Sequence, residues 1–424
     1  METVEQTYQY LVGIDWATEK HDVCVLDPQG HVVSRHVVEH RGDALRAWFD
    51  ELLKLAEGHP ERLAIGIETS RGALVESLVE RGFHVYSLNP KQLDRFRDRH
   101  NVAGAKDDKL DSFVVGDSLR TDRQCFRRVR VDDPVIIQVR ELSRASEDLT
   151  VEIGRLSNQL REQVYRLLPQ LLTLCPAADE PWLWDLLTLI AGGAEPTRIR
   201  PTQVERILKV HRIRRLTAEE ILALLREQPP WTTPGTQLAV RAHIGLLMPR
   251  LRTALEQSRD CERQIKMLLD ELAGPPAAEG EIREHRDVRI LQSLPGAGKV
   301  VVATMLAEAS QPLAERDYQS LRSQAGIAPV TKASGKRSKH RAIVTMRYAC
   351  NDRLRAAFFH WARAAVTLDE RSRDLYARHR QQGQTLGRAL RSVGDHLLRI
   401  LIAMLKSRTL FDANRAAKRL AETA

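Results

Sequence analysis

The chain has 424 residues, of which 43% are hydrophobic, 29% are charged and 5% are aromatic, and its formal net charge is +9. This length allows two or three domains with ample core, and the composition is that of a soluble globular protein. The scarcity of aromatic residues disfavours a protein built of β-sandwich modules. The positive excess predicts a polyanionic partner, and nucleic acid is the first choice, with a ribosome-associated or membrane-surface protein as alternatives.

The five cysteines are widely spaced and form no C-x-x-C pair. This spacing predicts neither a zinc site nor a disulfide framework, and it suits a reducing cytosol. The first residues, METVEQTYQY, lack the basic and apolar regions of a signal peptide. No stretch approaches the roughly 20 apolar residues that span a bilayer. We therefore expect a cytoplasmic protein without a membrane partner.

The N-terminal third has the alternating pattern of strands. Residues 9–38 contain three strand-like runs, with a hairpin turn at 27–30 before the third. The elements expected after them are a helix at 44–58, a strand at 63–68, a helix from Gly72, a strand at 84–90 and a helix from about Lys106. This order, βββαβαβα, indicates an α/β domain of the RNase H-like (RuvC-like) kind over residues 1–130, with a mixed sheet and helices on its faces.

The character of the chain changes near Pro134, where apolar residues begin to recur at three- and four-residue steps. The first stripe contains Leu142, Leu149, Ile153, Leu156, Leu160, Val164 and Leu167, and the second contains Leu251, Leu255, Ile265, Leu269 and Leu272. Either an intramolecular helical hairpin or a dimerising coiled coil would produce such stripes. We expect a helical/coiled-coil region over 131–280, a linker at 273–280 (AGPPAAEG), and a mainly α-helical domain over 281–424.

Four acidic residues stand on the elements that converge in an RNase H-like fold. Asp15 lies in the middle of the first strand, Glu68 closes the strand 63–68, and Asp108 and Asp111 are three apart on one helix face. Buried carboxylates are costly unless they are paired or bound to metal. Taken singly, each acid is more often structural or solvated, but together they predict a site for Mg²⁺ or Mn²⁺. Asp107 is an alternative to Asp108.

A pair of such ions can stabilise the attacking and the leaving oxygen of a phosphodiester displacement. The acidic residues therefore indicate phosphoryl-transfer chemistry on a nucleic acid.

The C-terminal domain begins with LQSLPGAGKVVVATMLAEA. This stretch is not a Walker A motif, because Ser293 stands at the first glycine position and Val300 follows Lys299. We favour a helix-hairpin-helix, in which Gly296, Gly298 and Lys299 bind a phosphate with the free N–H groups of the second helix. An ordinary helix-capping turn is the alternative.

Residues 318–351 contain no acidic residue but many cations. These are Arg322, Lys332, Lys336, Arg337, Lys339, Arg341 and Arg347. Such a cluster is the electrostatic footprint expected for a phosphate backbone, and we expect Lys332, Lys336, Arg337, Lys339 and Arg341 to bind nucleic acid. The loop VTKASGKRSKHRA also carries Ser334 and Ser338, but by itself it indicates only phosphate binding.

Five stretches occur in the order found in one family of proteins. VGIDWATEKHDVCVLD, AIGIETS, AKDDKLDS, LPGAGKVVVATMLAE and GIAPVTKASGK together resemble the insertion-sequence transposases of the one-hundred-ten/eleven-eleven group, which includes the Piv-like DNA invertases. The resemblance covers the N-terminal third and the region from about 286 to 405. The middle helical region is similar only in character.

The resemblance implies a RuvC-like domain joined through a coiled coil to a transposase domain with a catalytic serine. Residue by residue, the implied metal ligands are Asp15, Glu68, Asp108 and Asp111, and the implied nucleophile is Ser334. It further implies donor and target DNA, a noncoding bridge RNA that pairs with both, and a dimer or tetramer with composite sites. Asp107 departs from the family pattern. The serine alignment rests on the Ser-Gly pair, so Ser338 is a rival.

The implied chemistry fits the residues. A serine hydroxyl needs activation before it can attack, and the sequence shows no Ser-His-Asp set. Metal bound by the acids would instead assist deprotonation of the serine, and Lys and Arg would neutralise charge on the phosphoryl group in the transition state. A phosphoserine ester would preserve the energy of the broken phosphodiester, in keeping with the missing Walker A motif. Two rival hypotheses are a RuvC-like, structure-selective nuclease that uses metal-bound water, and a non-enzymatic nucleic-acid-binding protein. The intact set of four acids argues against the second rival.

Overall fold

The computed structural model describes residues 8–99, 108–130, 132–227, 233–274, 286–332 and 343–413. The chain divides into two compact units, Met1–Asp133 and Pro134–Ala424. The second unit contains both the predicted helical region and the predicted C-terminal domain.

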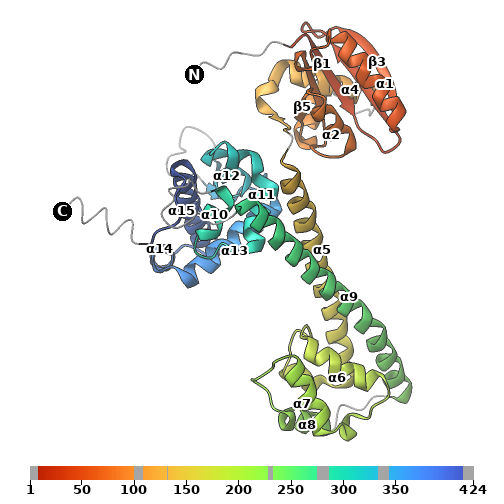
Figure 1. Cartoon of the computed structure of the whole chain (residues 1–424), viewed down its shortest axis with the longest axis vertical. Helices are drawn as coiled ribbons and strands as arrows, with labels where there is room; N and C mark the ends of the chain where they lie inside the picture. Colours follow the sequence, from red (N-terminus) through yellow and green to blue (C-terminus); the bar gives the residue numbers. More distant parts are fainter. Residues whose placement is uncertain are drawn as a thin grey trace, which may run out of the picture. The chain divides into compact units, whose positions relative to one another are not determined.

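A six-stranded mixed sheet forms the centre of the first unit (Figure 1). Its strands are β1 (Tyr10–Asp15), β2 (Lys20–Leu26), β3 (Val32–Glu39), β4 (Leu63–Ile67), β5 (His84–Ser87) and β6 (Arg127–Arg128), in the spatial order β3-β2-β1-β4-β5-β6. The strands β1, β4 and β5 are parallel neighbours, whereas β2 is antiparallel to β1 and β3, and β6 is antiparallel to β5.

The helices of this unit are α1 (Gly42–Leu55), α2 (Ala73–Glu80), α3 (Pro90–Arg97) and α4 (Asp108–Asp122), with 3₁₀ turns at Pro60–Arg62 and Arg123–Cys125. The predicted mixed α/β domain is therefore confirmed, and α3 is an addition to the expected elements. The RNase H-like assignment stays a prediction.

Helices cover both faces of the sheet. Successive strand residues point to opposite faces, so β1 contributes Leu11 to one core and Val12 and Ile14 to another. The core with Leu11 includes Val115 of α4, and the core with Val12 and Ile14 includes Trp48 of α1. The face of β1 that carries Leu11 and Gly13 is thus the α4 face.

Helix α4 lies directly on the backbone of β1. A Cβ atom added at Gly13 would stand 1.9 Å from the carbonyl oxygen of Ser112 and 2.4 Å from the backbone nitrogen of Gly116. No other residue type fits at Gly13 without moving the helix. Glycine at this position therefore determines how closely α4 approaches the sheet.

The second unit is mainly helical (Figure 1). Its helices are α5 (Pro134–Leu167), α6 (Pro181–Ala191), α7 (Pro201–Val210), α8 (Ala218–Arg226), α9 (Pro234–Ala273), α10 (Asp287–Ser293), α11 (Lys299–Ala314), α12 (Tyr318–Gln324), α13 (Asp352–Leu368), α14 (Glu370–Gln381) and α15 (Leu386–Ser407). Two 3₁₀ turns, Pro169–Thr173 and Pro196–Arg198, and a two-stranded sheet of β7 (Val330–Lys332) and β8 (Ile343–Thr345) complete it.

The two predicted leucine stripes pack within one chain, because α5 and α9 lie against each other (Figure 1). One end of the pair, with Leu160 and Leu251, joins the core of α6, α7 and α8. The other end, with Ile265 and Leu269, joins the core of α10 to α15. Of the two alternatives, the intramolecular helical hairpin is the one that this chain forms.

A buried carboxylate ties α5 to the C-terminal helices. Glu308 of α11 accepts hydrogen bonds from Nε of Arg144 at 3.1 Å and from Nδ2 of Asn351 at 2.8 Å, and it pairs with Arg353 at 3.3 Å. Burial raises the pKa of Glu308, but these donors and charges outweigh burial and hold the pKa below its ordinary value. The ion pairs therefore join α5, α11 and α13 in one rigid group.

Two expectations from composition concern the whole chain. All five cysteines carry free thiols. Within the described ranges, no helix combines the length and the apolar character needed to cross a bilayer.

Candidate active site

Asp15 and Glu68 occupy matching positions on neighbouring parallel strands. The last register pair between β1 and β4 is Ile14 with Ile67, and one acid follows directly on each strand. Asp15 is the last residue of β1, not a residue in the middle of the strand as we expected, because the chain turns toward β2 after it. Asp15 is two residues beyond Gly13 on β1, so it projects from the α4 face, and Glu68 directly follows the last residue of β4 at the same carboxyl edge of the sheet.

The first turn of α4 lies at the same edge. Ser112 contacts β1 at Gly13, and Gly116, one turn later, contacts Leu26, the register partner of Leu11. Helix α4 therefore runs from the carboxyl end of β1 toward its amino end, and its first residues stand beside Asp15. The helix begins at Asp108, so the backbone brings the third predicted acid to this edge, although the Asp108 side chain and all of Asp107 lie outside the described residues.

Asp111, the fourth predicted acid, is held by a cation. The Nε atom of Arg97, at the end of α3, donates to Oδ1 of Asp111 at 2.6 Å, and Arg97 also pairs with Asp94 at 2.8 Å. Burial lowers the pKa of Arg97, but Asp111 and Asp94 outweigh burial and raise the pKa above its ordinary value. The sequence analysis missed Arg97, since nothing in the spacing indicates that the end of α3 faces α4.

A further carboxylate stands beside Asp15. Asp22 of β2 is the register partner of Asp15, and partners in an antiparallel pair project from the same face of the sheet. The sequence analysis missed Asp22 as well. The alternation in HDVCVLD carried a signal, because Asp22 falls in step with Cys24 and Leu26 of the α4 face.

The donors at this edge fit a hard divalent cation, because Asp15, Glu68 and Asp111 offer carboxylate oxygens. Among the side chains that the structure describes, no three His, Cys, Asp or Glu residues form a ready-made metal site. The Asp108 carboxylate is not part of that set.

The predicted phosphate-binding turn connects α10 to α11. Gly296 has a φ of +76°, and a Cβ atom there would stand 2.6 Å from the backbone nitrogen of Ala365 in α13. Gly296 is therefore required for packing. Gly298 is the N-cap of α11 and has open space around it, and Lys299 is exposed, so these two residues are accessible to a ligand. The helix-hairpin-helix stays a prediction.

The basic loop lies largely outside the described residues. Lys332 is the last residue of β7, and the residues that follow it before β8 are not described, namely Ser334, Lys336, Arg337, Ser338, Lys339 and Arg341. Arg322, also part of the predicted cationic cluster, donates to the buried Asp395 at 2.8 Å, and the Tyr318 hydroxyl donates to the same oxygen at 2.7 Å. Arg322 thus has a structural role in joining α12 to α15.

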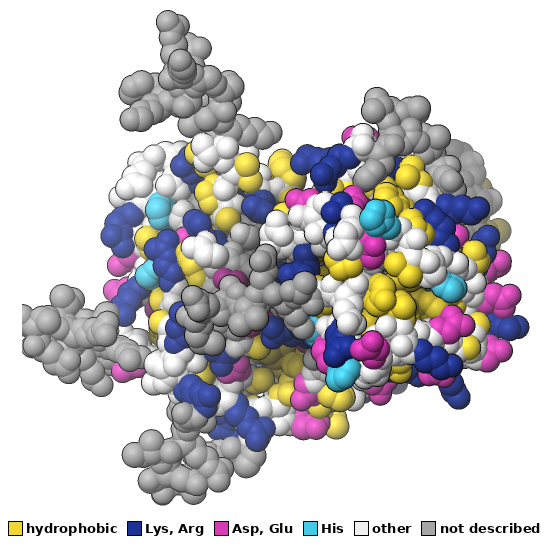
Figure 2. Space-filling view, turned by 90° about the horizontal axis from the view of Figure 1, so that it is seen from above, with side chains coloured by type: hydrophobic (Ala, Val, Ile, Leu, Met, Phe, Trp, Pro, Cys, Tyr) yellow, Lys and Arg dark blue, Asp and Glu magenta, His cyan; other side chains and the backbone are white. Residues whose placement is uncertain are grey.

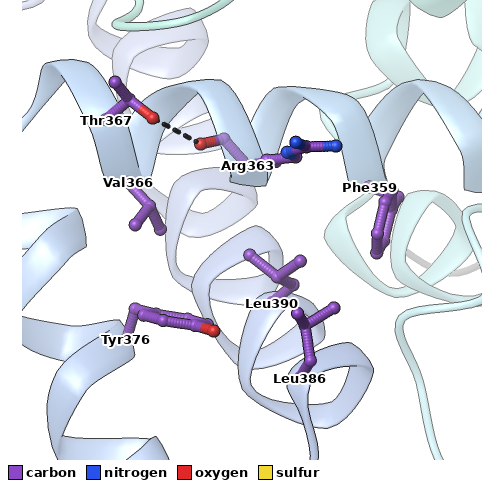
Figure 3. A pocket seen from close by; sticks show the side chains of 7 residues that line it. All are labelled: Phe359, Arg363, Val366, Thr367, Tyr376, Leu386 and Leu390. Carbon is purple, nitrogen blue, oxygen red and sulfur yellow. Dashed lines mark hydrogen bonds between the residues drawn. The ribbon is translucent and has the colours of Figure 1, made fainter. Parts of the chain in front are cut away.

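The face in Figure 2 mixes side chains of several kinds among its described residues. On the face shown in Figure 2, Lys and Arg side chains alternate with acidic, hydrophobic and histidine side chains. A cavity of about 340 Å³ between α13, α14 and α15 is lined mainly by apolar side chains, among them Phe359, Leu386 and Leu390 (Figure 3). Arg363 is the charged residue in this lining, and none of the predicted site residues belongs to it.

Both ends of the chain match known transposase families. Residues 12–169 match a family described as "Transposase", and residues 288–377 match the family described as "Transposase IS116/IS110/IS902 family". Over these two ranges the chain is similar to transposases of the IS116/IS110/IS902 family. This similarity supports the predicted insertion-sequence transposase.

Individual relatives match over different lengths. A Sinorhizobium fredii protein named as the transposase y4uE is 44% identical over 209 residues, which is 49% of this chain and 58% of that protein. A Streptomyces coelicolor protein named as the mini-circle transposase for IS117 is 29% identical over 99% of both chains. The 43.6 kDa protein of insertion element IS110, also from Streptomyces coelicolor, is 28% identical over 96% of both chains.

The two family matches contain the predicted site residues of this chain. The N-terminal match spans Asp15, Glu68, Asp108 and Asp111, and the C-terminal match spans Ser334 together with the turn between α10 and α11.

Proposed function

We propose that this protein is a transposase that cuts and rejoins DNA strands through a phosphoserine intermediate on Ser334, assisted by Mg²⁺ or Mn²⁺ at Asp15, Glu68, Asp108 and Asp111. The observation that carries the proposal is the matching position of Asp15 and Glu68 at the carboxyl edge of β1 and β4, with the first turn of α4 at the same edge. Acids gathered at one sheet edge are suited to phosphoryl transfer because they can hold divalent cations.

In the proposed cleavage step, Oγ of Ser334 forms a bond to the scissile phosphorus and the bond from phosphorus to the sugar oxygen breaks. The serine proton is released, and the departing sugar oxygen gains a proton. Rejoining is the reverse step with the hydroxyl of another strand, so no nucleotide cofactor is consumed. Lys332, Lys336 and Arg337, close to Ser334 in sequence, would neutralise charge on the transferring phosphoryl group. Bound Mg²⁺ or Mn²⁺ would supply Lewis-acid stabilisation of the phosphate oxygens.

Donor and target DNA are the proposed substrates, a noncoding bridge RNA is the proposed guide, and the proposed assembly is a dimer or tetramer. The guide and the assembly rest on the family resemblance. Expressing the protein together with the DNA that flanks its gene, then sequencing the RNA that copurifies, tests the guide. RNA with segments that match both donor and target is expected, and copurification of unrelated cellular RNA alone would contradict it.

Substitution of the serines distinguishes the recombinase from the rival nuclease. Ser334→Ala should abolish both recombination and the covalent protein–DNA adduct seen on a denaturing gel. Ser338→Ala, four residues away in the same basic loop, is the matched control and should retain both. If Ser334→Ala still cuts DNA while Asp15→Ala does not, the structure-selective nuclease is the correct alternative.

Calorimetric titration with Mn²⁺ tests the metal site without measuring activity. Asp15→Asn and Glu68→Gln should each weaken binding at least about tenfold, because each removes one charged oxygen ligand. Asp43→Asn, at a carboxylate that is 75% exposed and paired with Arg41, is the control and should bind as the parent does. Equal affinities in all variants would rule out the proposed ligands.

A further inference from the structure

An exposed indole stands next to the acidic edge. Trp16 directly follows Asp15 and is 46% exposed, which is unusual for the largest apolar side chain. It begins the short loop between β1 and β2, at the end of the sheet where Asp15 and Glu68 lie. The indole stacks on His21, which alternates with Asp22 along β2, so it lies on the α1 side of this end of the sheet, whereas Asp15 projects from the α4 side.

The Trp16 ring has a rigid partner. The imidazole of His21 is fully buried, and its centroid is 6.5 Å from the centroid of Trp16, with the two planes 22° apart. Nδ1 of His21 accepts from the backbone N–H of Ala17 at 3.4 Å, so Nε2 carries the proton and donates to Nδ1 of His40 at 2.9 Å. Two hydrogen bonds thus hold the His21 imidazole in place, and the Trp16 indole stacks on this held ring.

His40 connects this pair to a cationic cavity in the same unit. The cavity has a volume of about 310 Å³ and is lined by His40, Arg46, Phe49 and Arg81, among others. Arg81 lies over the Phe49 ring at 4.7 Å from the centroid, which holds its guanidinium in place. The nearby acids Glu39 and Asp43 both pair with Arg41, at 3.1 and 3.4 Å, and not with Arg46 or Arg81.

We infer that Trp16 and the cavity lined by His40, Arg46 and Arg81 form a binding site for single-stranded nucleic acid, in which a base stacks on the indole and a backbone phosphate enters the cavity. Aromatic stacking combined with cationic contacts is the usual means of binding single strands without sequence preference. The site lies at the same end of the sheet as the acidic edge but on the α1 side, where it would hold a flanking part of the strand, and in this sense it rests on the proposed function of the acidic edge. DNA and RNA strands offer the same chemistry here, and the experiment separates them.

Photocrosslinking locates the stacked base. Single strands of about 12 nucleotides, one of DNA and one of RNA, each carrying one 5-iodouracil base, are irradiated with the full-length protein in a chelating buffer without metal. Trypsin then releases residues 1–20 as the fragment that contains Trp16. We expect an adduct on Trp16 with at least one of the two strands, and the strand that reacts identifies the source. Adducts only at other residues with both strands would overturn the inference.

Affinity measured by fluorescence anisotropy with the same strands gives the second readout. Trp16→Ala should weaken binding about 5- to 100-fold, whereas Trp16→Phe should restore most of the affinity. Arg46→Gln and Arg81→Gln should each reduce the slope of log affinity against log salt by about one. Tyr165→Ala on α5, an aromatic residue that is 65% exposed, is the matched control and should bind as the parent does.

The outcomes separate this inference from the proposed function. If Trp16→Ala binds and crosslinks as the parent does while Asp15→Asn abolishes strand cleavage, the nucleotide site is wrong and the acidic edge stands. If Asp15→Asn cleaves normally while Trp16→Ala loses binding, the proposed function fails and the binding site stands. Thermal melting of each variant shows that an effect does not come from unfolding, as expected for exposed positions.

Discussion

The guanidinium of Arg97 donates a 2.6 Å hydrogen bond to the carboxylate of Asp111. Only 13% of the Asp111 side chain and 17% of the Arg97 side chain are exposed, so this ion pair links α3 to the first turn of α4 in a partly buried setting. Removal of one partner leaves a poorly hydrated charge, which costs more than the net contribution of the pair.

Arg97→Gln should therefore lower the free energy of unfolding of the first unit by about 1 to 3 kcal/mol in urea denaturation. Arg41→Gln removes a guanidinium whose side chain is 65% exposed, and it should cost less than about 1 kcal/mol. If both substitutions lower the free energy of unfolding by the same amount, the ion pair between Arg97 and Asp111 does not stabilise α4.

The contact between Gly13 and α4 predicts that alanine is far more destabilising at Gly13 than at an exposed glycine of a helix. Gly13→Ala would place Cβ 1.9 Å from the carbonyl oxygen of Ser112, so α4 must move or the domain must unfold. A loss of about 3 kcal/mol or more is expected, together with loss of activity, because the first turn of α4 carries two of the proposed ligands.

Gly154→Ala is the matched control for Gly13→Ala. Gly154 lies inside α5 with nothing within 4 Å of an added Cβ atom, so alanine should stabilise the helix by about 0.5 to 1 kcal/mol. Equal effects at the two glycines, measured by thermal melting, would contradict the close packing of α4 on β1.

The buried carboxylate of Glu308 is expected to stabilise the second unit. Glu308→Ala leaves Arg144 and Arg353 without the buried carboxylate, and it should cost about 3 to 5 kcal/mol. Hydrogen exchange of α11 and α13 should accelerate. Glu141→Ala, which removes a carboxylate that is 67% exposed and also pairs with Arg144, should change little. Unchanged protection in Glu308→Ala would show that the ion pairs do not hold these helices together.

Two buried histidines predict an acid-sensitive first unit. Burial lowers the pKa of His84 from 6.5 to about 4, and burial together with the charge of His40 lowers that of His21 to about 4. Between pH 6.5 and about pH 4 the unfolded chain binds more protons than the folded chain. The free energy of unfolding is therefore highest above pH 6.5 and falls as the pH drops to about 4. Each histidine contributes about 2 to 3 kcal/mol to this loss.

Urea midpoints of the first unit, measured between pH 4 and 7, test this dependence. His84→Gln should remove about half of the pH dependence, because His21 remains. His59→Gln, at a ring that is 53% exposed, is the control and should leave the slope unchanged. A parent protein with pH-independent midpoints would contradict the expected shifts.

Much of the architecture followed from local patterns. The alternation around β1, β2 and β3 and the short apolar run of β4 predicted a mixed α/β domain, and this prediction is confirmed. The leucine stripes predicted two long helices, observed as α5 and α9. These patterns depend on residues close in the chain, and for this reason the sequence shows them.

Other relationships depend on residues far apart. The leucine stripes did not distinguish an intramolecular helical hairpin from a dimerising coiled coil. An apolar helix face has the same sequence pattern whether its partner helix comes from the same chain or from another. The Arg97–Asp111 pair and the placement of Asp22 beside Asp15 depend on strand register and helix packing. Gly296 was expected at a phosphate, but its positive φ and its contact with α13 give it a packing role.

The sequence by itself determined the element order, the family resemblance and the identity of the acids, because these reside in residue types and their spacing. The tertiary structure decided that Asp15 and Glu68 lie at one edge of one sheet, and that α4 begins at that edge. The physical reason is that strand pairing and the glycine contact with α4 bring together residues that are about 50 to 100 positions apart in sequence.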